Sequence, residues 1–166
     1  MTQGGPEGVT ALDFREAMSR WASGVAVVSV RDAEGVAATT VSSFSSLSLD
    51  PPLVVVALQQ ISRTLKRVEA AGRFSVSVLS TTQRDISVRC AKGESDGLAF
   101  SEEAFVQDCL ASLSCTLLDV HRYGDHLLLV GRVVGIQRGA DGEPLVYWNR
   151  AYRAVTAHPD PAPARK

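Results

Sequence analysis

Cysteine is scarce in this sequence and occurs in a pattern that argues against most of its specialised uses. The 166 residues contain three cysteines, Cys90, Cys109 and Cys115, and no C-x-x-C pair. An odd number without metal-ligand spacing disfavours both a disulfide framework and a metal site, and it indicates free thiols in a reducing compartment. Free cysteine most often serves as a small buried hydrophobic residue.

Excess charge and long apolar runs are also missing. Seventeen Lys and Arg residues face 18 Asp and Glu residues, a formal net charge of -1. This balance leaves no basic field for nucleic acid or an anionic membrane. No apolar run approaches the roughly 18 residues of a spanning helix, and the first residues, "MTQGGPEG", lack the features of a signal peptide. We therefore expect a cytoplasmic protein with no nucleic-acid or membrane partner.

Several well-known site motifs are absent as well. The sequence has no G-x-G-x-x-G after a strand-like segment, no G-x-x-x-x-G-K-[ST], no H-E-x-x-H and no G-x-S-x-G. Their absence disfavours a doubly wound nucleotide-binding fold, a P-loop enzyme, a zinc protease and an α/β-hydrolase. The composition, 45% hydrophobic and 21% charged, is that of one globular domain. We expect this domain over residues 10–155, with flexible tails at 1–9 and 156–166.

The hydrophobic pattern predicts more strands than helices. Helices are expected over 10–24, where Thr10 and Asp13 suit a capping box, over 62–72 with Gly72 after its end, and over 82–91. Strands are expected at 25–30, 35–41, 53–58, 114–123, 126–138, 145–148 and 151–155, and at 73–79, where alternating serines predict one face in water.

Most of these strands adjoin through turns. Gly124-Asp125 predicts a hairpin between two long strands. Since regular helical crossovers are missing, the sheet should be mainly antiparallel, and closure into a barrel would remove its free edges. The expected fold class is mainly β, with a few short flanking helices.

A ribbon of hydroxyl side chains stands directly before the most apolar strand. Seven of the ten residues from Thr39 to Ser48 carry hydroxyls, and Leu53 to Leu58 is entirely apolar. Short polar side chains with an accessible backbone suit the edge of a planar heteroaromatic ligand, with Val41 and Leu47 supporting its apolar parts. The alternative is a polar sheet edge whose hydroxyls satisfy local backbone groups.

Two further segments suggest a ligand site. Ser62 can cap a helix that also carries Arg63, Lys66 and Arg67, an arrangement suited to phosphate. A capped surface helix with a solvated basic face explains the same residues. His126 stands where a turn enters an apolar strand and could contact a ligand, although a lone histidine often has a structural partner instead.

Together these segments resemble the flavin reductase family, the small NAD(P)H:flavin oxidoreductases of two-component monooxygenases. The matching stretches are "FREAMSRWASGVAVVSV" (14–30), "TTVSSFSSLSLDPPLVVVAL" (39–58), "SRTLKRV" (62–68), "FSVSVLSTTQRDIS" (74–87), "GDHLLLVGRV" (124–133) and "PLVYWNRAYRAV" (144–155). The resemblance implies an antiparallel flavin-binding split β-barrel, a homodimer, FAD or FMN as flavin, a reduced nicotinamide as donor, and a separate monooxygenase that receives reduced flavin by diffusion. NADH is expected more than NADPH, because the sequence has no cationic cluster beyond 63–67 for a 2′-phosphate.

The resemblance also implies roles for particular residues. His126 corresponds to a histidine near the nicotinamide and is the expected catalytic residue. The remaining positions are expected to bind the flavin: Thr39, Thr40, Val41, Ser42, Ser46, Leu47, Ile61, Ser62, Arg63, Cys90, Ala91 and Tyr152. Departures from the family pattern occur at Ser77, where many relatives have Asn, at Cys90, where Phe is usual, and in a shorter segment 93–108.

Other functions fit parts of the same pattern. The chain could be a split-barrel oxidoreductase that retains its flavin and acts on an organic substrate. It could also be a flavin- or haem-binding module without catalysis, or a purely structural barrel. NADH turnover and flavin binding separate these functions from that of a flavin reductase.

Overall fold

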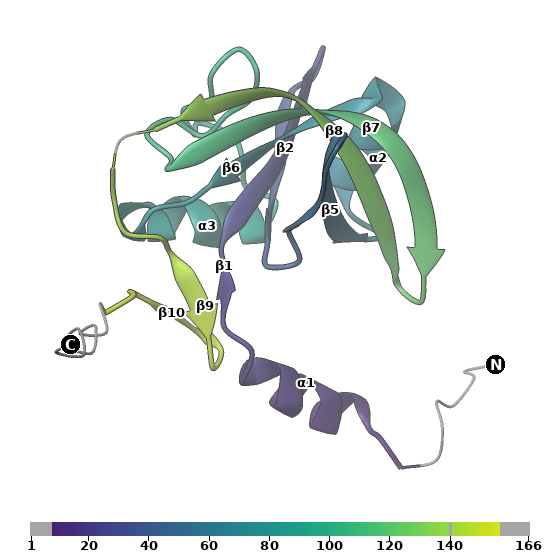
Figure 1. Ribbon diagram of the computed structural model, residues 1–166, viewed down its shortest axis with the longest axis vertical. Coiled ribbons are helices and arrows are strands. Elements are labelled where there is room, and N and C mark those ends of the chain that lie inside the picture. The colour runs from purple at the N-terminus through teal and green to yellow at the C-terminus, as the bar shows by residue number, and fades with distance from the viewer. Residues whose placement is uncertain (1–7, 140, 157–166) are drawn as a thin grey trace, which may run out of the picture.

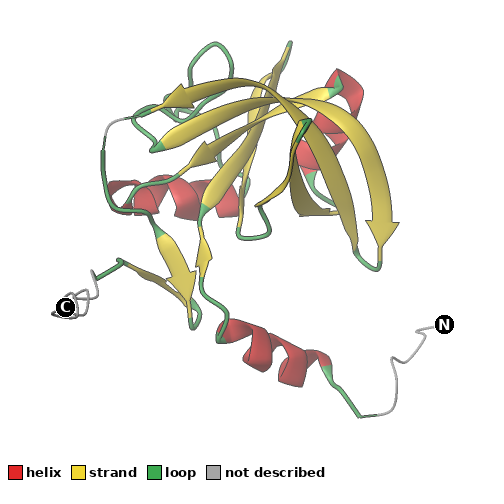
Figure 2. Cartoon of the chain, viewed as in Figure 1, coloured by secondary structure: helices red, strands yellow, loops and turns green. Residues whose placement is uncertain are grey.

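A computed structural model of the chain describes residues 8–139 and 141–156. Strands dominate it (Figure 2). The strands are β1 (Ser23–Gly24), β2 (Ala26–Asp32), β3 (Gly35–Val41), β4 (Ser45–Leu49), β5 (Pro52–Gln59), β6 (Arg73–Val78), β7 (Ala111–Tyr123), β8 (His126–Arg138), β9 (Val146–Trp148) and β10 (Ala151–Arg153). The helices are α1 (Ala11–Ser19), α2 (Arg63–Ala71), the 3-10 turn η1 (Thr81–Gln83) and α3 (Arg84–Ala91).

Seven strands form one curved antiparallel sheet in the order β3-β2-β6-β7-β8-β5-β4. The sheet curls until β3 and β5 approach each other, and α2 and α3 lie against it (Figure 1). A smaller sheet, β1-β9-β10, extends from the main body. The predicted fold class is confirmed: a mainly β, antiparallel architecture with short helices.

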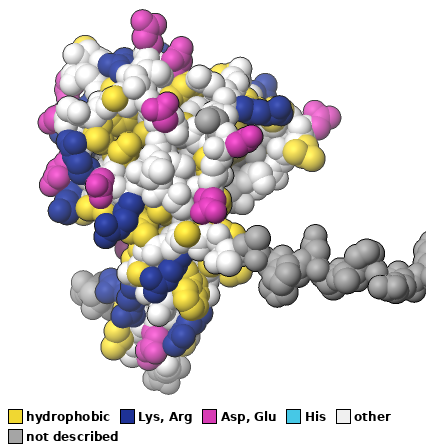
Figure 3. All heavy atoms as spheres, turned by 90° about the vertical axis from the view of Figure 1, so that its left-hand side faces the viewer, with side chains coloured by type: hydrophobic (Ala, Val, Ile, Leu, Met, Phe, Trp, Pro, Cys, Tyr) yellow, Lys and Arg dark blue, Asp and Glu magenta, His cyan; other side chains and the backbone are white. Residues whose placement is uncertain are grey.

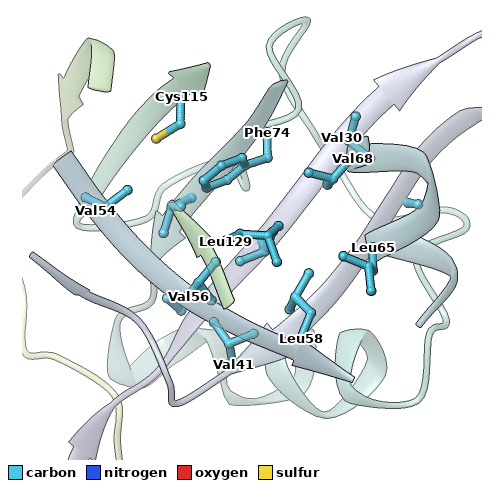
Figure 4. Close-up of a cluster of buried hydrophobic side chains, with 14 residues drawn as sticks. Val30, Val41, Val54, Val56, Leu58, Leu65, Val68, Phe74, Cys115 and Leu129 are labelled. Carbon is cyan, nitrogen blue, oxygen red and sulfur yellow. The ribbon is translucent and has the colours of Figure 1, made fainter. Parts of the chain in front are cut away.

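The core inside the curved sheet is aliphatic. Val56, Leu58 and Leu129 point into the space that the strands enclose, and α2 contributes Leu65 from its buried face (Figure 4). These side chains are at most 3% exposed. Strand β5 lies between β8 and β4 in the sheet, as the apolar run at 53–58 predicted, and its alternate residues enter this core.

The three predicted helices exist, with local signals that explain their ends. Thr10 and Asp13 form the expected capping box, and Ser62 accepts from the Leu65 N–H at the start of α2. Gly72 ends α2 in the left-handed conformation at φ 65°, which glycine adopts without strain. The first helix is shorter than predicted, since it ends at Ser19 instead of continuing to Gly24.

The prediction that one face of 73–79 meets water is wrong. Ser75 and Ser77 of β6 are buried, because the segment 101–106 covers that face of the sheet. Ser75 Oγ donates to the Glu103 carbonyl at 2.6 Å, and the Val106 N–H donates to Ser77 Oγ at 3.0 Å. Ser29 of β2 likewise donates to the Ala104 carbonyl at 2.6 Å. These hydroxyls fasten the covering segment to the sheet.

The predicted β7–β8 hairpin is confirmed, and the structure fixes the length of its turn, which the sequence left open. Tyr123 pairs with His126, so Gly124 and Asp125 alone form the turn, with Gly124 at φ 60°. The first strand begins at Ala111 and is thus longer than the predicted 114–123. Most of the predicted tails, 1–9 and 156–166, lie outside the described residues. Within the described part of the chain, no helix combines the length and apolarity that a membrane crossing requires.

Candidate functional site

A hollow of about 600 Å³ opens between the ends of β3 and β5, the start of α2 and the end of α3. Its volume lies in the range of small-molecule sites, roughly 300–1,000 Å³. Nine of the thirteen residues predicted for a flavin and nicotinamide site line this hollow: Thr39, Thr40, Val41, Ser42, Ile61, Ser62, Arg63, Ala91 and His126. Tertiary structure has therefore assembled residues that lie far apart in the sequence.

The hydroxyl ribbon forms one wall of the hollow. It continues from β3 into the connection at 42–44, where Ser42 and Ser43 are exposed. Val41 is 7% exposed and belongs to the core beneath this wall. The apolar interior therefore anchors the strip that lines the hollow, which is the rigid support that a binding site needs.

The start of α2 forms a second, electropositive wall. The hollow is lined there by Ser62, Arg63 and Thr64. The first N–H groups of a helix carry partial positive charge and lack partners within the helix, so they favour an anion. Arg63 is exposed and adds a full charge. This combination of donors fits a phosphate group.

Arg67, one turn further along α2, is bonded to the β2–β3 hairpin and not directed to the hollow. Its Nε donates to Asp32 Oδ2 at 2.6 Å, and its guanidinium also donates to the Gly35 carbonyl at 2.7 Å. The hydrogen bonds from Arg67 hold the pKa of Asp32 below its usual range, with help from the Glu34 N–H. Arg67 thus joins α2 to the β2–β3 hairpin, while Arg63 remains at the hollow.

His126 also lines the hollow. It begins β8 and pairs with Gln59 of β5. Ile61, two residues after Gln59, lines the same hollow and is 85% exposed. Its Nδ1 lies 2.7 Å from Asp125 Oδ1, and this contact lowers the pKa of the Asp125 carboxyl. An ionised Asp125 accepts a hydrogen bond from Nδ1–H, so Nε2 remains for a ligand.

The turn that carries His126 is itself held in place. The Gln60 side-chain amide donates to the Gly124 carbonyl at 2.7 Å, and the Gln60 N–H donates to the Asp125 carbonyl at 3.1 Å. These bonds join the β7–β8 turn to the segment between β5 and α2. The histidine and the helix start consequently have a fixed relative position.

Four of the predicted residues lie outside the hollow. Ser46 and Leu47 are on β4, where Leu47 is 53% exposed. Cys90 is buried in a separate hydrophobic cluster with Leu79 and Val106, and burial raises the pKa of its thiol to about 11. The Tyr152 hydroxyl lies 2.8 Å from Ser87 Oγ. Their flavin contacts remain predictions.

The structure adds lining residues that the sequence did not single out. Gln59 ends β5, while Lys92 and Gly93 follow α3. Lys92 is an exposed cation directly after a predicted helix. A cation at the end of a helix could have been recognised in the sequence as a candidate ligand contact. Gln59 carried no such signal, because only strand pairing with His126 brings it to the site.

Comparisons with known proteins agree with this geometry. Residues 18–156 match the family model described as flavin reductase like domain. The chain is 42% identical over 142 residues to the reductase component of 4-hydroxyphenylacetate 3-monooxygenase from Thermus thermophilus, covering 86% of this chain and 95% of that protein. It is 34% identical over 155 residues to an NADH-dependent flavin reductase from a Rhodococcus species, covering 89% and 88%.

A solved structure gives the same result in three dimensions. The flavin reductase of styrene monooxygenase from Pseudomonas putida superposes with a TM-score of 0.81 at 32% identity, covering 88% of this chain and 99% of that one. The family model spans far more than half of the sequence. The chain therefore belongs to the flavin reductase family.

Proposed function

We propose that this protein is an NADH-dependent flavin reductase that supplies reduced flavin to a separate monooxygenase. The observation that carries the proposal is the hollow itself. It places a polar ribbon, a helix start suited to phosphate and a histidine around one space of small-molecule size. The relatives named above, which are flavin reductases or reductase components of monooxygenases, support the same activity.

The flavin would lie along the ribbon, with its phosphate at the start of α2. Backbone groups at 39–42 would meet the polar edge of the ring system, and Val41 would support it from the core side. Ser62 and Arg63 would hold the phosphate of FMN or FAD. The described lining includes no further feature that selects between these two flavins, so both are proposed as substrates.

The flavin supplies the hydride acceptor, and the reaction requires no nucleophile from the protein. The chain's task is to hold the donor and the acceptor roughly 3–3.5 Å apart and aligned. Donors along the ribbon would stabilise negative charge at the polar edge of the ring. His126, oriented by Asp125, would position the nicotinamide over the hollow.

We further propose NADH as the preferred donor. The Rhodococcus relative is NADH-dependent, and a 2′-phosphate bound at the start of α2 beside the flavin phosphate would require a second free cation on that helix. Arg67 is engaged by Asp32 and Gly35, so α2 offers fewer available charges than its sequence indicates. The open form of the hollow would also let reduced flavin leave toward an oxygenase.

A homodimer is proposed from the apolar surface of α1. This helix buries none of its own residues and stands apart from the main sheet (Figure 1). Phe14, Met18 and Trp21 border a groove of about 780 Å³ with Tyr147 and Trp148. Figure 3 shows hydrophobic side chains on the lower part of the molecule, at the height of α1 and the small sheet. A second copy would cover this surface, and light scattering coupled to gel filtration tests the dimer.

Steady-state NADH oxidation tests the main proposal. The expected result is turnover that requires added FMN or FAD and is faster with NADH than with NADPH. Riboflavin serves as the comparison without a phosphate. The proposal fails if neither nicotinamide is oxidised in the presence of any of these flavins. Stoichiometric flavin that stays bound through purification would favour a flavin-retaining oxidoreductase instead.

A further inference from the structure

One buried serine connects three elements next to the hollow. Ser87 lies in the middle of α3 and is completely buried. The Thr40 hydroxyl of β3 donates to the Ser87 carbonyl at 2.6 Å. On the other side, Ser87 Oγ shares a hydrogen bond of 2.8 Å with the Tyr152 hydroxyl of β10. Both hydroxyls therefore have partners on α3.

Tyr152 is held in this position by its neighbours. The Tyr147 ring of β9 meets it edge-on, with centroids 5.4 Å apart and an interplanar angle of 69°. The Arg84 guanidinium lies 5.7 Å from the centre of the Tyr152 ring. Such edge-on and cation–π contacts favour one orientation of the ring. The hydroxyl is thus directed at Ser87 by contacts on its own hairpin and on α3.

The end of α3 forms part of the wall of the hollow. Ala91, Lys92 and Gly93 line it, and Ala91 lies four residues after Ser87. In an α-helix the carbonyl at position i accepts from the N–H at i+4. The Ser87 carbonyl, which accepts from the Thr40 hydroxyl, is therefore also the carbonyl that pairs with the Ala91 N–H. A shift of α3 at Ser87 would therefore move the wall at Ala91–Gly93.

We propose that Tyr152 is a positioning residue for flavin binding, acting through the Ser87 hydroxyl on the end of α3 and not by touching the flavin. The inference rests on the proposed function, because it concerns the same hollow. A buried hydrogen bond contributes a modest net free energy, but leaving its partner unsatisfied costs more. Loss of the Tyr152 hydroxyl should therefore let α3 readjust.

A double-mutant cycle tests this route. Wild type, Tyr152→Phe, Ser87→Ala and the double variant are compared by the dissociation constant for FMN, measured by fluorescence quenching. Tyr152→Phe in the wild-type background should raise this constant about 3- to 10-fold. In the Ser87→Ala background the same change should have no further effect, because the hydroxyl has lost the group through which it acts.

Other readouts separate positioning from general damage. The turnover number at saturating flavin and the Michaelis constant for NADH should stay within about twofold of wild type, and thermal melting should show that all variants fold. Tyr147→Phe removes one hydroxyl from the same hairpin and should leave FMN binding unchanged.

Two results would overturn the inference. Equal weakening of FMN binding by Tyr152→Phe in both backgrounds would indicate direct contact with the flavin. Unchanged FMN binding in Tyr152→Phe would show that the connection through Ser87 does not matter. Failure of wild type to bind any flavin is a different outcome, since it overturns the proposed function before the variants are compared.

Discussion

Ser43 and Ala57 exchange two hydrogen bonds across the gap between the ribbon and β5. Ser43 Oγ donates to the Ala57 carbonyl at 2.9 Å and accepts from the Ala57 N–H at 3.1 Å. The Ser43 side chain thereby bonds to the N–H and the carbonyl of Ala57, the two backbone groups that a neighbouring strand would otherwise satisfy. It fixes the connection at 42–44, which lines the hollow, to the apolar strand that supports the core.

Ser43→Ala should therefore loosen the ribbon. We expect the free energy of unfolding to fall by about 1 kcal/mol, since two backbone groups of Ala57 lose their partner. FMN binding should weaken as well, because the wall of the hollow is no longer fixed. Ser43→Thr keeps the hydroxyl and is the control. Denaturant titration and flavin titration check both effects, and identical stability of Ser43→Ala and wild type would contradict the assigned role.

Gly131 of β8 should not tolerate a side chain. A Cβ at this position would lie 2.8 Å from Phe74 Cε1 and 3.1 Å from Cys115 Cβ, and the Phe74 ring is buried in the core. Gly131→Ala should reduce stability by about 1–3 kcal/mol through overpacking. Gly135→Ala is the matched control on the same strand, because its Cβ would meet Ser114 at an ordinary 3.5 Å. Equal thermal melting of both variants would disprove the steric account.

Arg63 should affect flavins that carry a phosphate more than those that do not. Arg63→Gln removes the charge that the structure places at the start of α2. We expect FMN binding to weaken about 10-fold, the size of a lost charge-assisted contact, with riboflavin binding almost unchanged. Lys66→Gln removes a charge from the same helix outside the hollow and serves as control. Equal weakening for FMN and riboflavin would place the phosphate elsewhere.

His126 should influence the nicotinamide more than the flavin. His126→Ala is expected to raise the Michaelis constant for NADH several-fold while the FMN dissociation constant changes little. His121→Ala is a close control. That histidine is on the same hairpin and contacts Asp119 at 2.9 Å, as His126 contacts Asp125, but the residues described as lining the hollow do not include it. Unaltered NADH kinetics in His126→Ala would refute its role.

Asp32 should make stability depend on pH in acid. Arg67 lowers the pKa of Asp32 in the folded state below its value of about 3.8 in the unfolded chain. The ion pair therefore stabilises the fold above that pH, and the contribution disappears as the pH falls through the lower, folded value. Asp32→Asn should melt below wild type at pH 7, and the difference in melting temperature should shrink as the pH falls below about 3.8. A constant difference across this range would contradict the linkage.

Local chemistry made several features predictable. The capping box at Thr10 and Asp13, the helix start at Ser62 and the hairpin at Gly124-Asp125 depend on neighbours within a few residues. The apolar run of β5 indicated an inner strand for a similar reason. The expectation that residues now found around the hollow bind a flavin came from the resemblance of motifs and not from periodicity.

Other features depended on partners distant in the chain. Ser75 and Ser77 alternate with valines as a solvent-facing row would, yet the segment 101–106 buries them. The Tyr152 hydroxyl meets Ser87, 65 residues away, a contact that no local pattern indicates. Arg67 was predicted to offer a charge to an anion, but it donates to Asp32, 35 residues away. A hydroxyl or guanidinium has the same appearance in a sequence whether water, ligand or backbone receives its hydrogen bond.

The sequence by itself determined where the strands and helices form and which polar segments could meet a ligand, because hydrophobic period, caps and turns act over short distances. Only the tertiary structure decided which polar groups remain available at the hollow and which are used to join one element to another. The physical reason is that every buried donor and acceptor requires a partner, and in a curved antiparallel sheet that partner usually comes from a distant part of the chain.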